Sequence, residues 1–115
     1  MAVTIYHNPR CSKSRETLAL LEKNSIEPEI VEYLKNPLNA EQISTLVNLL
    51  ELDSARDMMR TKEDLYKTLE LKSQTNEEAL IIAMAENPKL IERPIVINGN
   101  KAAIGRPPEN VLSVL

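Results

Sequence analysis

The segment from residue 2 to residue 24 constrains the fold more than any other part of the chain. Residues 2–6 alternate and are rich in strand formers, and the pair Asn8-Pro9 then interrupts this pattern. Leucines at helical spacing follow and continue to about Asn24. The sequence therefore predicts a strand, a turn and a helix that begins near Cys11, with the cysteine at the helix N-terminus.

An extended stretch at residues 29–33 predicts a second strand, so the chain opens with a β-α-β unit. Three helices are then expected: one from Asn39 with a capping box to Gln42, one over residues 62–69, and one opened by a second capping box of Thr75 and Glu78. A β-hairpin over residues 94–104, with its turn at residues 98–100, and a short helix after Pro107-Pro108 complete the pattern.

This order of elements predicts one domain over residues 1–115 of the α/β class. We expect a thioredoxin-like fold, in which helices flank a small mixed β-sheet and a helical segment is inserted at about residues 38–86. A chain of 115 residues can bury a core without disulfides or a structural metal, and 43% hydrophobic residues are typical of a globular protein.

Composition excludes several classes of function. The chain has no Trp or Phe and a formal charge of −3, which argues against stacking platforms and phosphate-binding faces for nucleic acid. No apolar run approaches the roughly 20 residues that span a bilayer, and no signal peptide pattern is present. We therefore expect a cytoplasmic protein with no nucleic-acid or membrane partner.

Positive charge is concentrated around the single cysteine. Residues 1–15 contain no Asp or Glu, and Arg10, Lys13 and Arg15 lie beside Cys11 and His7. A helix N-terminus and nearby cations lower the pKa of a cysteine and stabilise the nucleophilic thiolate, and the same amides bind oxyanions. Because no apolar residue lies between Asn8 and Glu16, we expect a reactive, partly exposed thiol that His7 helps to tune.

Two positions after the cysteine limit its chemistry. Ser14 stands where Cys-x-x-Cys proteins have a resolving thiol, so an external thiol must complete any redox cycle. A Cys-x5-Arg phosphate loop would need arginine at position 17, where this chain has Thr17.

Three arginines lie at chain breaks: Arg60, Arg93 before Pro94, and Arg106 before Pro107-Pro108. Each could be a solvated side chain, but arginine also suits a tetrahedral oxyanion because its planar fork donates paired hydrogen bonds.

The chain resembles the glutaredoxin-coupled arsenate reductases of the thioredoxin-like fold. The blocks that carry this resemblance occur in order along nearly the whole chain: residues 7–15 (HNPRCSKSR), 33–37 (YLKNP), 93–96 (RPIV) and 105–107 (GRP). Two features depart from the best-studied members: Arg10, Ser12 and Lys13 replace small residues, and the sequence stops at Leu115 without their C-terminal extension.

The resemblance implies that Cys11 is the nucleophile, that His7 helps keep it ionised, and that Arg60, Arg93 and Arg106 bind the oxyanion. Ser14, Arg15 and Pro94 would support the site, with a cis Arg93-Pro94 bond. Arsenate would form an adduct with Cys11, glutathione would then reduce the arsenic to arsenite, and glutaredoxin would clear the mixed disulfide. No metal and no bound cofactor is implied.

Two alternatives remain open from the sequence. A glutathione-dependent thiol oxidoreductase with another substrate would use the arginines to hold glutathione carboxylates. An Spx-like regulator that binds RNA polymerase shares the fold, but such regulators sense oxidation through a Cys-x-x-Cys pair, and Ser14 removes the second cysteine.

Overall fold

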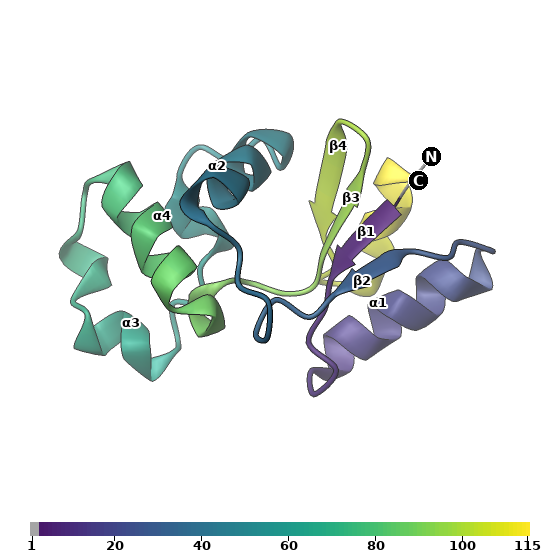
Figure 1. The fold of residues 1–115 in the computed structure, drawn as a ribbon, viewed down its shortest axis with the longest axis horizontal. Helices are drawn as coiled ribbons and strands as arrows, with labels where there is room; N and C mark the ends of the chain where they lie inside the picture. Colours follow the sequence, from purple (N-terminus) through teal and green to yellow (C-terminus); the bar gives the residue numbers. More distant parts are fainter. Residues whose placement is uncertain (1–2) are drawn as a thin grey trace. The chain divides into compact units, whose positions relative to one another are not determined.

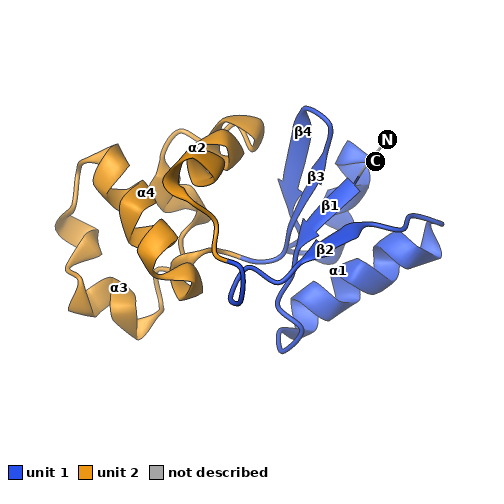
Figure 2. Ribbon diagram, in the orientation of Figure 1, with its two compact units in different colours: residues 1–36, 93–115 blue, residues 37–92 orange. Residues whose placement is uncertain are grey.

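The computed structural model describes residues 3–115, which form two compact units (Figure 2). The sheet unit comprises residues 1–36 and 93–115, and the helical unit comprises residues 37–92. The helical unit includes the segment expected to be inserted at about residues 38–86. The expectation that the whole chain is a single domain stays a prediction.

The sheet unit contains a four-stranded sheet with the order β2-β1-β3-β4 (Figure 1). Its strands are β1 (Val3–Tyr6), β2 (Glu29–Val31), β3 (Ile95–Asn98) and β4 (Lys101–Ile104). β1 pairs in parallel with β2 and antiparallel with β3, which in turn pairs antiparallel with β4. The predicted mixed sheet is confirmed, although β2 is shorter than expected and Ala2 lies outside the described residues.

Helix α1 (Ser12–Lys23) begins and ends as the sequence predicts, with Cys11 as its N-cap and Asn24 as its C-cap. α1 and the 3-10 helix η4 (Pro108–Val114) contribute to one apolar cluster on the sheet. The buried members of this cluster are all aliphatic: Val3, Ile5, Leu21, Val96, Val111 and Val114. Among residues 3–115, no helix is both long and apolar enough to cross a bilayer.

The hairpin between β3 and β4 turns one position later than the Asn-Gly pair suggests. Asn98 pairs with Lys101 and belongs to β3, so the two-residue loop is Gly99-Asn100. Gly99 has φ +63°, in the left-handed region that glycine adopts without steric cost. Glycine at the first loop position is typical of a type II′ turn.

The helical unit contains α2 (Ala40–Leu49), α3 (Asp64–Thr68) and α4 (Glu77–Glu86), with short 3-10 helices η1 (Ala55–Met58), η2 (Leu71–Ser73) and η3 (Pro88–Leu90). The capping box of α2 is confirmed: the Asn39 N–H donates to Gln42 Oε1 at 2.9 Å, and the Gln42 N–H donates to Asn39 Oδ1 at 2.8 Å. The helix predicted over residues 62–69 is shorter, since α3 has 5 residues.

The capping box predicted from Thr75 and Glu78 is wrong. Asn76 caps α4 instead, and its Oδ1 accepts the Ala79 N–H at 3.0 Å. Asparagine is at least as good an N-cap as threonine, and it lies next to Thr75 in the sequence. The helix therefore begins one residue later than the sequence pattern indicates.

Candidate functional site

The loop between β1 and α1 is a tight turn that places Cys11 at the helix start. Asn8 organises it: its carbonyl accepts the Cys11 N–H at 3.0 Å, and its Oδ1 accepts the Arg10 N–H at 3.0 Å. Cys11 has an extended backbone, with φ −93° and ψ 124°, and its carbonyl accepts the Arg15 N–H at 3.0 Å. The cysteine thus stands before the first turn of α1, where free backbone N–H groups gather.

Ser14 fastens this loop to the helix. Its Oγ accepts the Asn8 N–H at 3.0 Å and lies 2.6 Å from His7 Nδ1. Ser14 is fully buried and His7 is 6% exposed, so this small polar cluster lies inside the sheet unit. The sequence predicted a supporting role for Ser14, and the structure supplies contacts of that kind.

Cys11 itself is buried rather than partly exposed, with 8% of its surface accessible. The prediction of partial exposure was wrong because it considered only neighbours in the sequence. Arg106 lies 95 positions away, and its Nη2 donates to Cys11 Sγ at 3.5 Å. Polar groups from distant segments can bury a thiol just as an apolar core can.

Arg93, which precedes β3, and Arg106, which follows β4, lie next to each other in the sheet unit. The Arg106 Nε donates to the Arg93 carbonyl at 2.8 Å, and the Gly105 N–H donates to the Pro94 carbonyl at 2.9 Å. The predicted cis bond between Arg93 and Pro94 is confirmed, and the bond between Arg106 and Pro107 is also cis. These contacts join two short segments that the sequence separates by the whole β3–β4 hairpin.

Several groups act on the charge of Cys11. Burial is the largest influence and raises the pKa of the thiol, because desolvation disfavours the thiolate. Hydrogen bonds from the backbone N–H groups of Ser14 and Lys13 lower it, as do the positive charges of Arg93 and Arg106. Together the lowering influences prevail, and the pKa of Cys11 lies below its ordinary value.

The pKa of His7 is also lowered, chiefly because burial disfavours the charged imidazolium. Glu32 opposes this effect and Arg15 adds to it. His7 is therefore neutral at pH 7, and it reaches the helix start through Ser14. Its predicted part in keeping Cys11 ionised stays a prediction.

The remaining predicted residues have other partners. The Arg15 Nη1 donates to the Pro9 carbonyl at 3.0 Å, which braces the loop before Cys11. Arg60 belongs to the helical unit, where its Nη1 lies 2.9 Å from Glu63 Oε2 and its N–H donates to the Leu90 carbonyl. The structure thus brings Arg93 and Arg106 together with Cys11, while the oxyanion-binding role of Arg60 stays a prediction.

Residues 6–114 match the model of the ArsC family. The chain belongs to the ArsC family.

Relatives of the ArsC family match along the full chain. The chain is 53% identical to an arsenate reductase of Haemophilus influenzae over 100% of both sequences, and 60% identical to the uncharacterised protein YfgD of Escherichia coli over 98% of this chain and 96% of that one. A solved structure of an arsenate reductase from Vibrio cholerae superposes with a TM-score of 0.97 at 55% identity, covering 100% of this chain and 98% of that chain. The predicted thioredoxin-like fold is confirmed by this likeness.

The sequence pattern did not single out Thr17 and Gly105, which are closely packed in the structure. In the sequence Thr17 shows only that a Cys-x5-Arg loop is absent, yet its side chain is fully buried and donates to the Lys13 carbonyl in the first turn of α1. Gly105 was noted only as part of a sequence block. The one signal in the sequence was that the chain has just 2 glycines, and this one lies outside the predicted hairpin turn.

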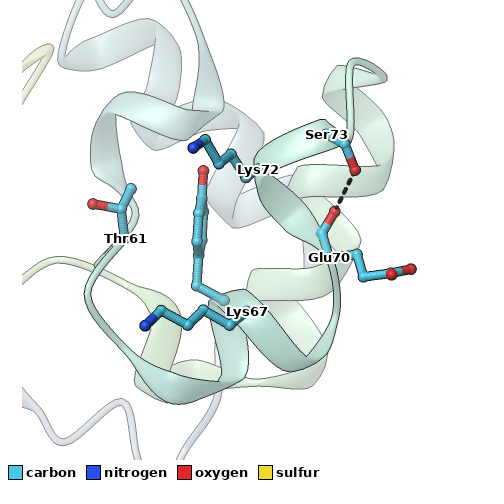
Figure 3. A pocket seen from close by; sticks show the side chains of 6 residues that line it. Thr61, Lys67, Glu70, Lys72 and Ser73 are labelled. Atoms are coloured by element: carbon cyan, nitrogen blue, oxygen red, sulfur yellow. Dashed lines mark hydrogen bonds between the residues drawn. The ribbon is translucent and has the colours of Figure 1, made fainter.

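The helical unit has a pocket of about 600 Å³ of its own (Figure 3). Tyr66, Lys67 and Lys72 line it. Thr61, Glu70 and Ser73 complete the lining. None of these residues belongs to the predicted site, and the lining contains no thiol.

Proposed function

We propose that this ArsC-family protein is an arsenate reductase that uses Cys11 as its nucleophile and takes electrons from glutathione and glutaredoxin. The observation that carries the proposal is the 3.5 Å contact between Arg106 Nη2 and Cys11 Sγ at the N-terminus of α1. A guanidinium fork and helix N–H groups at one sulfur suit an anionic electrophile, because both stabilise negative charge on it.

The chemistry follows from these groups. The Cys11 thiolate attacks the arsenic(V) of arsenate, an S–As bond forms, and a protonated arsenate oxygen leaves as water. The thiolate of glutathione then attacks Cys11 Sγ, the S–As electron pair passes to arsenic, and arsenite leaves as arsenic(III). Cys11 and glutathione are together oxidised by two electrons to a mixed disulfide, which the thiol of glutaredoxin reduces.

Several groups of the predicted site have a part in this scheme. The N–H groups of Lys13 and Ser14 and the guanidinium of Arg106 hold the thiolate before attack and stabilise the charged oxygens during it. Arg93 adds positive charge, Arg60 binds the oxyanion in the proposed reaction, and His7 and Ser14 hold the loop. No bound cofactor or metal takes part. Ser14 in place of a second cysteine is why an external thiol has to resolve the intermediate.

The test is arsenate-dependent NADPH oxidation in the presence of glutathione, glutaredoxin and glutathione reductase. We expect turnover by the wild type and none by Cys11→Ser, since a serine hydroxyl is not ionised at neutral pH. Arg106→Lys is the matched variant for the oxyanion site, because it keeps the charge but loses the planar fork. We expect its KM for arsenate to rise.

Absence of wild-type turnover, with Cys11 still alkylated rapidly below neutral pH, would contradict the arsenate proposal. That result would favour a glutathione-dependent thiol oxidoreductase with another substrate. Inhibition of such an activity by arsenate or phosphate would show whether the arginines bind oxyanions at all.

A further inference from the structure

Two segments of the sheet unit meet at Thr17 of α1 and Gly105 after β4. Thr17 is fully buried, and its Oγ1 donates to the Lys13 carbonyl at 2.8 Å. A Cβ atom placed on Gly105 would lie 2.6 Å from Thr17 Oγ1 and 2.8 Å from Pro94 Cγ. Real Cβ atoms essentially never approach other atoms so closely, so only glycine fits here without a shift.

The reason for glycine at position 105 is space rather than backbone conformation. Gly99 is the chain's other glycine, and it has φ +63°, while a Cβ atom placed on it would meet no atom within 4 Å. Gly105 is not among the residues with positive φ. The two glycines thus serve opposite purposes: Gly99 forms a turn, and Gly105 permits a close approach.

This close approach lies directly before Arg106 in the chain. The Gly105 N–H binds the Pro94 carbonyl at 2.9 Å, the Arg106 Nε binds the Arg93 carbonyl at 2.8 Å, and Arg106 Nη2 reaches Cys11 Sγ at 3.5 Å. Gly105 thus connects the close contact with Thr17 to the residue whose guanidinium reaches the sulfur.

The short side chain at position 17 makes room for this contact. A Cys-x5-Arg loop would supply its own arginine from position 17, but this chain has a short side chain there. Because Thr17 is short, Gly105 can approach α1, and the guanidinium comes from Arg106 instead. A longer side chain at position 17 would occupy the space that Gly105 uses.

We propose that Thr17 and Gly105 are positioning residues that set the distance between the Arg106 guanidinium and Cys11 Sγ. Neither residue touches the reacting atoms in the proposed function. The inference deepens that function and rests on it only for its effect on arsenate turnover, because the state of the thiol can be measured without arsenate.

The test is the pH dependence of Cys11 alkylation by iodoacetamide in Gly105→Ala. The added methyl group pushes residue 105 away from Thr17 and Pro94, and it withdraws the guanidinium from the sulfur. Alkylation reports the thiolate fraction, so we expect its rate in mildly acidic buffer to fall about threefold or more. The midpoint of the profile should move to higher pH.

Gly99→Ala is the matched control, because it also replaces a glycine and strains the backbone at φ +63°. It should lower the melting temperature and leave the alkylation profile unchanged. The decisive comparison is made in the Arg106→Ala background, where Gly105→Ala should have no further effect on the profile. An effect of Gly105→Ala that is present with Arg106 and absent without it shows that residue 105 acts on the thiol through Arg106.

If Gly105→Ala does not fold, alkylation of Cys11 in Thr17→Val and Thr17→Ser tests the inference instead. Valine puts a methyl group in place of Oγ1 and should reproduce the slower alkylation, while serine keeps Oγ1 and should stay near the wild type. A folded Gly105→Ala or Thr17→Val with the wild-type profile would overturn the inference. Absence of arsenate turnover in the wild type would not affect the alkylation result. Failure of the proposed function and failure of this inference can therefore be told apart.

Discussion

Each of the two units contains an arginine whose side chain donates hydrogen bonds to residues distant in the sequence. The two arginines differ in what accepts these hydrogen bonds. In the helical unit, Arg56 donates to the Tyr66 hydroxyl and to the carbonyls of Leu71 and Gln74, and its Cζ lies 5.9 Å from the Tyr66 ring centroid. In the sheet unit, Arg106 donates to the Arg93 carbonyl and to Cys11 Sγ.

The acceptor decides whether such an arginine affects reactivity or stability. The acceptors of Arg56 are the Tyr66 hydroxyl and two backbone carbonyls, so its hydrogen bonds hold loops of the helical unit in place. One acceptor of Arg106 is a sulfur whose charge can change, so the same kind of hydrogen bond alters reactivity. The comparison predicts that loss of Arg106 changes the thiol, and that loss of Arg56 changes stability alone.

The largest effect is expected from Arg106→Ala. Loss of a preorganised donor to a developing anion costs on the order of 10²- to 10³-fold in rate, and we expect a fall of that size in kcat/KM for arsenate. The pKa of Cys11 should also rise, because one of the charges that lowers it is gone. Steady-state kinetics and the pH dependence of alkylation measure the two effects. An unchanged alkylation profile would remove the distinction between the two arginines.

The next effect is expected from Arg56→Met, which keeps an unbranched apolar stem and removes the donors of the side chain. The carbonyls of Leu71 and Gln74 lose a charged partner, so the free energy of unfolding should fall by about 2–3 kcal/mol. Denaturant unfolding measures this loss. Cys11 alkylation should keep the wild-type profile, and a changed profile would contradict the comparison.

Ser14→Ala tests the polar cluster beside the cysteine. It removes the acceptor of the part-buried Asn8 N–H and the buried partner of His7 Nδ1, and should cost about 1–2 kcal/mol of unfolding free energy. Thermal unfolding compared with Ser12→Ala, at an exposed neighbouring position, provides the measurement. Equal stability of the two variants would show that the cluster does not hold the loop.

The smallest effect is expected from Glu77→Gln in the helical unit. The backbone N–H of Ala55 and the hydroxyl of Ser54 lower the pKa of Glu77. A carboxyl whose pKa is lower in the folded state stabilises the fold above its unfolded pKa, and this contribution disappears as the pH falls through the folded pKa. Solvent screening keeps it below about 1 kcal/mol.

Thermal unfolding of the wild type and Glu77→Gln over a pH series checks this effect. The difference in melting temperature should be present near neutral pH and vanish in acid. Glu78→Gln, at the next exposed position, is the control, because it removes a carboxylate from the same helix turn and leaves the Glu77 acceptor of the Ala55 N–H and the Ser54 hydroxyl in place. A difference that persists in acid would mean that the carboxylate charge is not its cause.

The local parts of the fold could be predicted from the sequence, and the long-range parts of the site could not. The turn at Asn8-Pro9, the helix start at Cys11 and the capping box at Asn39 depend on residues a few positions apart, and all three are found in the structure. The choice of Thr75 over Asn76 as an N-cap failed because adjacent residues of similar capping strength compete.

The contacts of Cys11 illustrate the limit. The sequence indicated an activated thiol through its charged neighbours, and the family resemblance named Arg93 and Arg106. Neither could show that Arg106 reaches the sulfur across 95 positions, or that Cys11 is buried. Those facts depend on the register of the β3–β4 hairpin and on the space between Thr17 and Gly105, which no local pattern encodes.

The central claim, that Cys11 is an activated thiolate held by groups of the sheet unit, is tested most directly by the pH dependence of its alkylation in the wild type. Cys11 is the only cysteine of the chain, so the signal has a single source. The account predicts a midpoint clearly below that of an ordinary cysteine such as free glutathione measured in parallel. A midpoint equal to or above that of glutathione would contradict it.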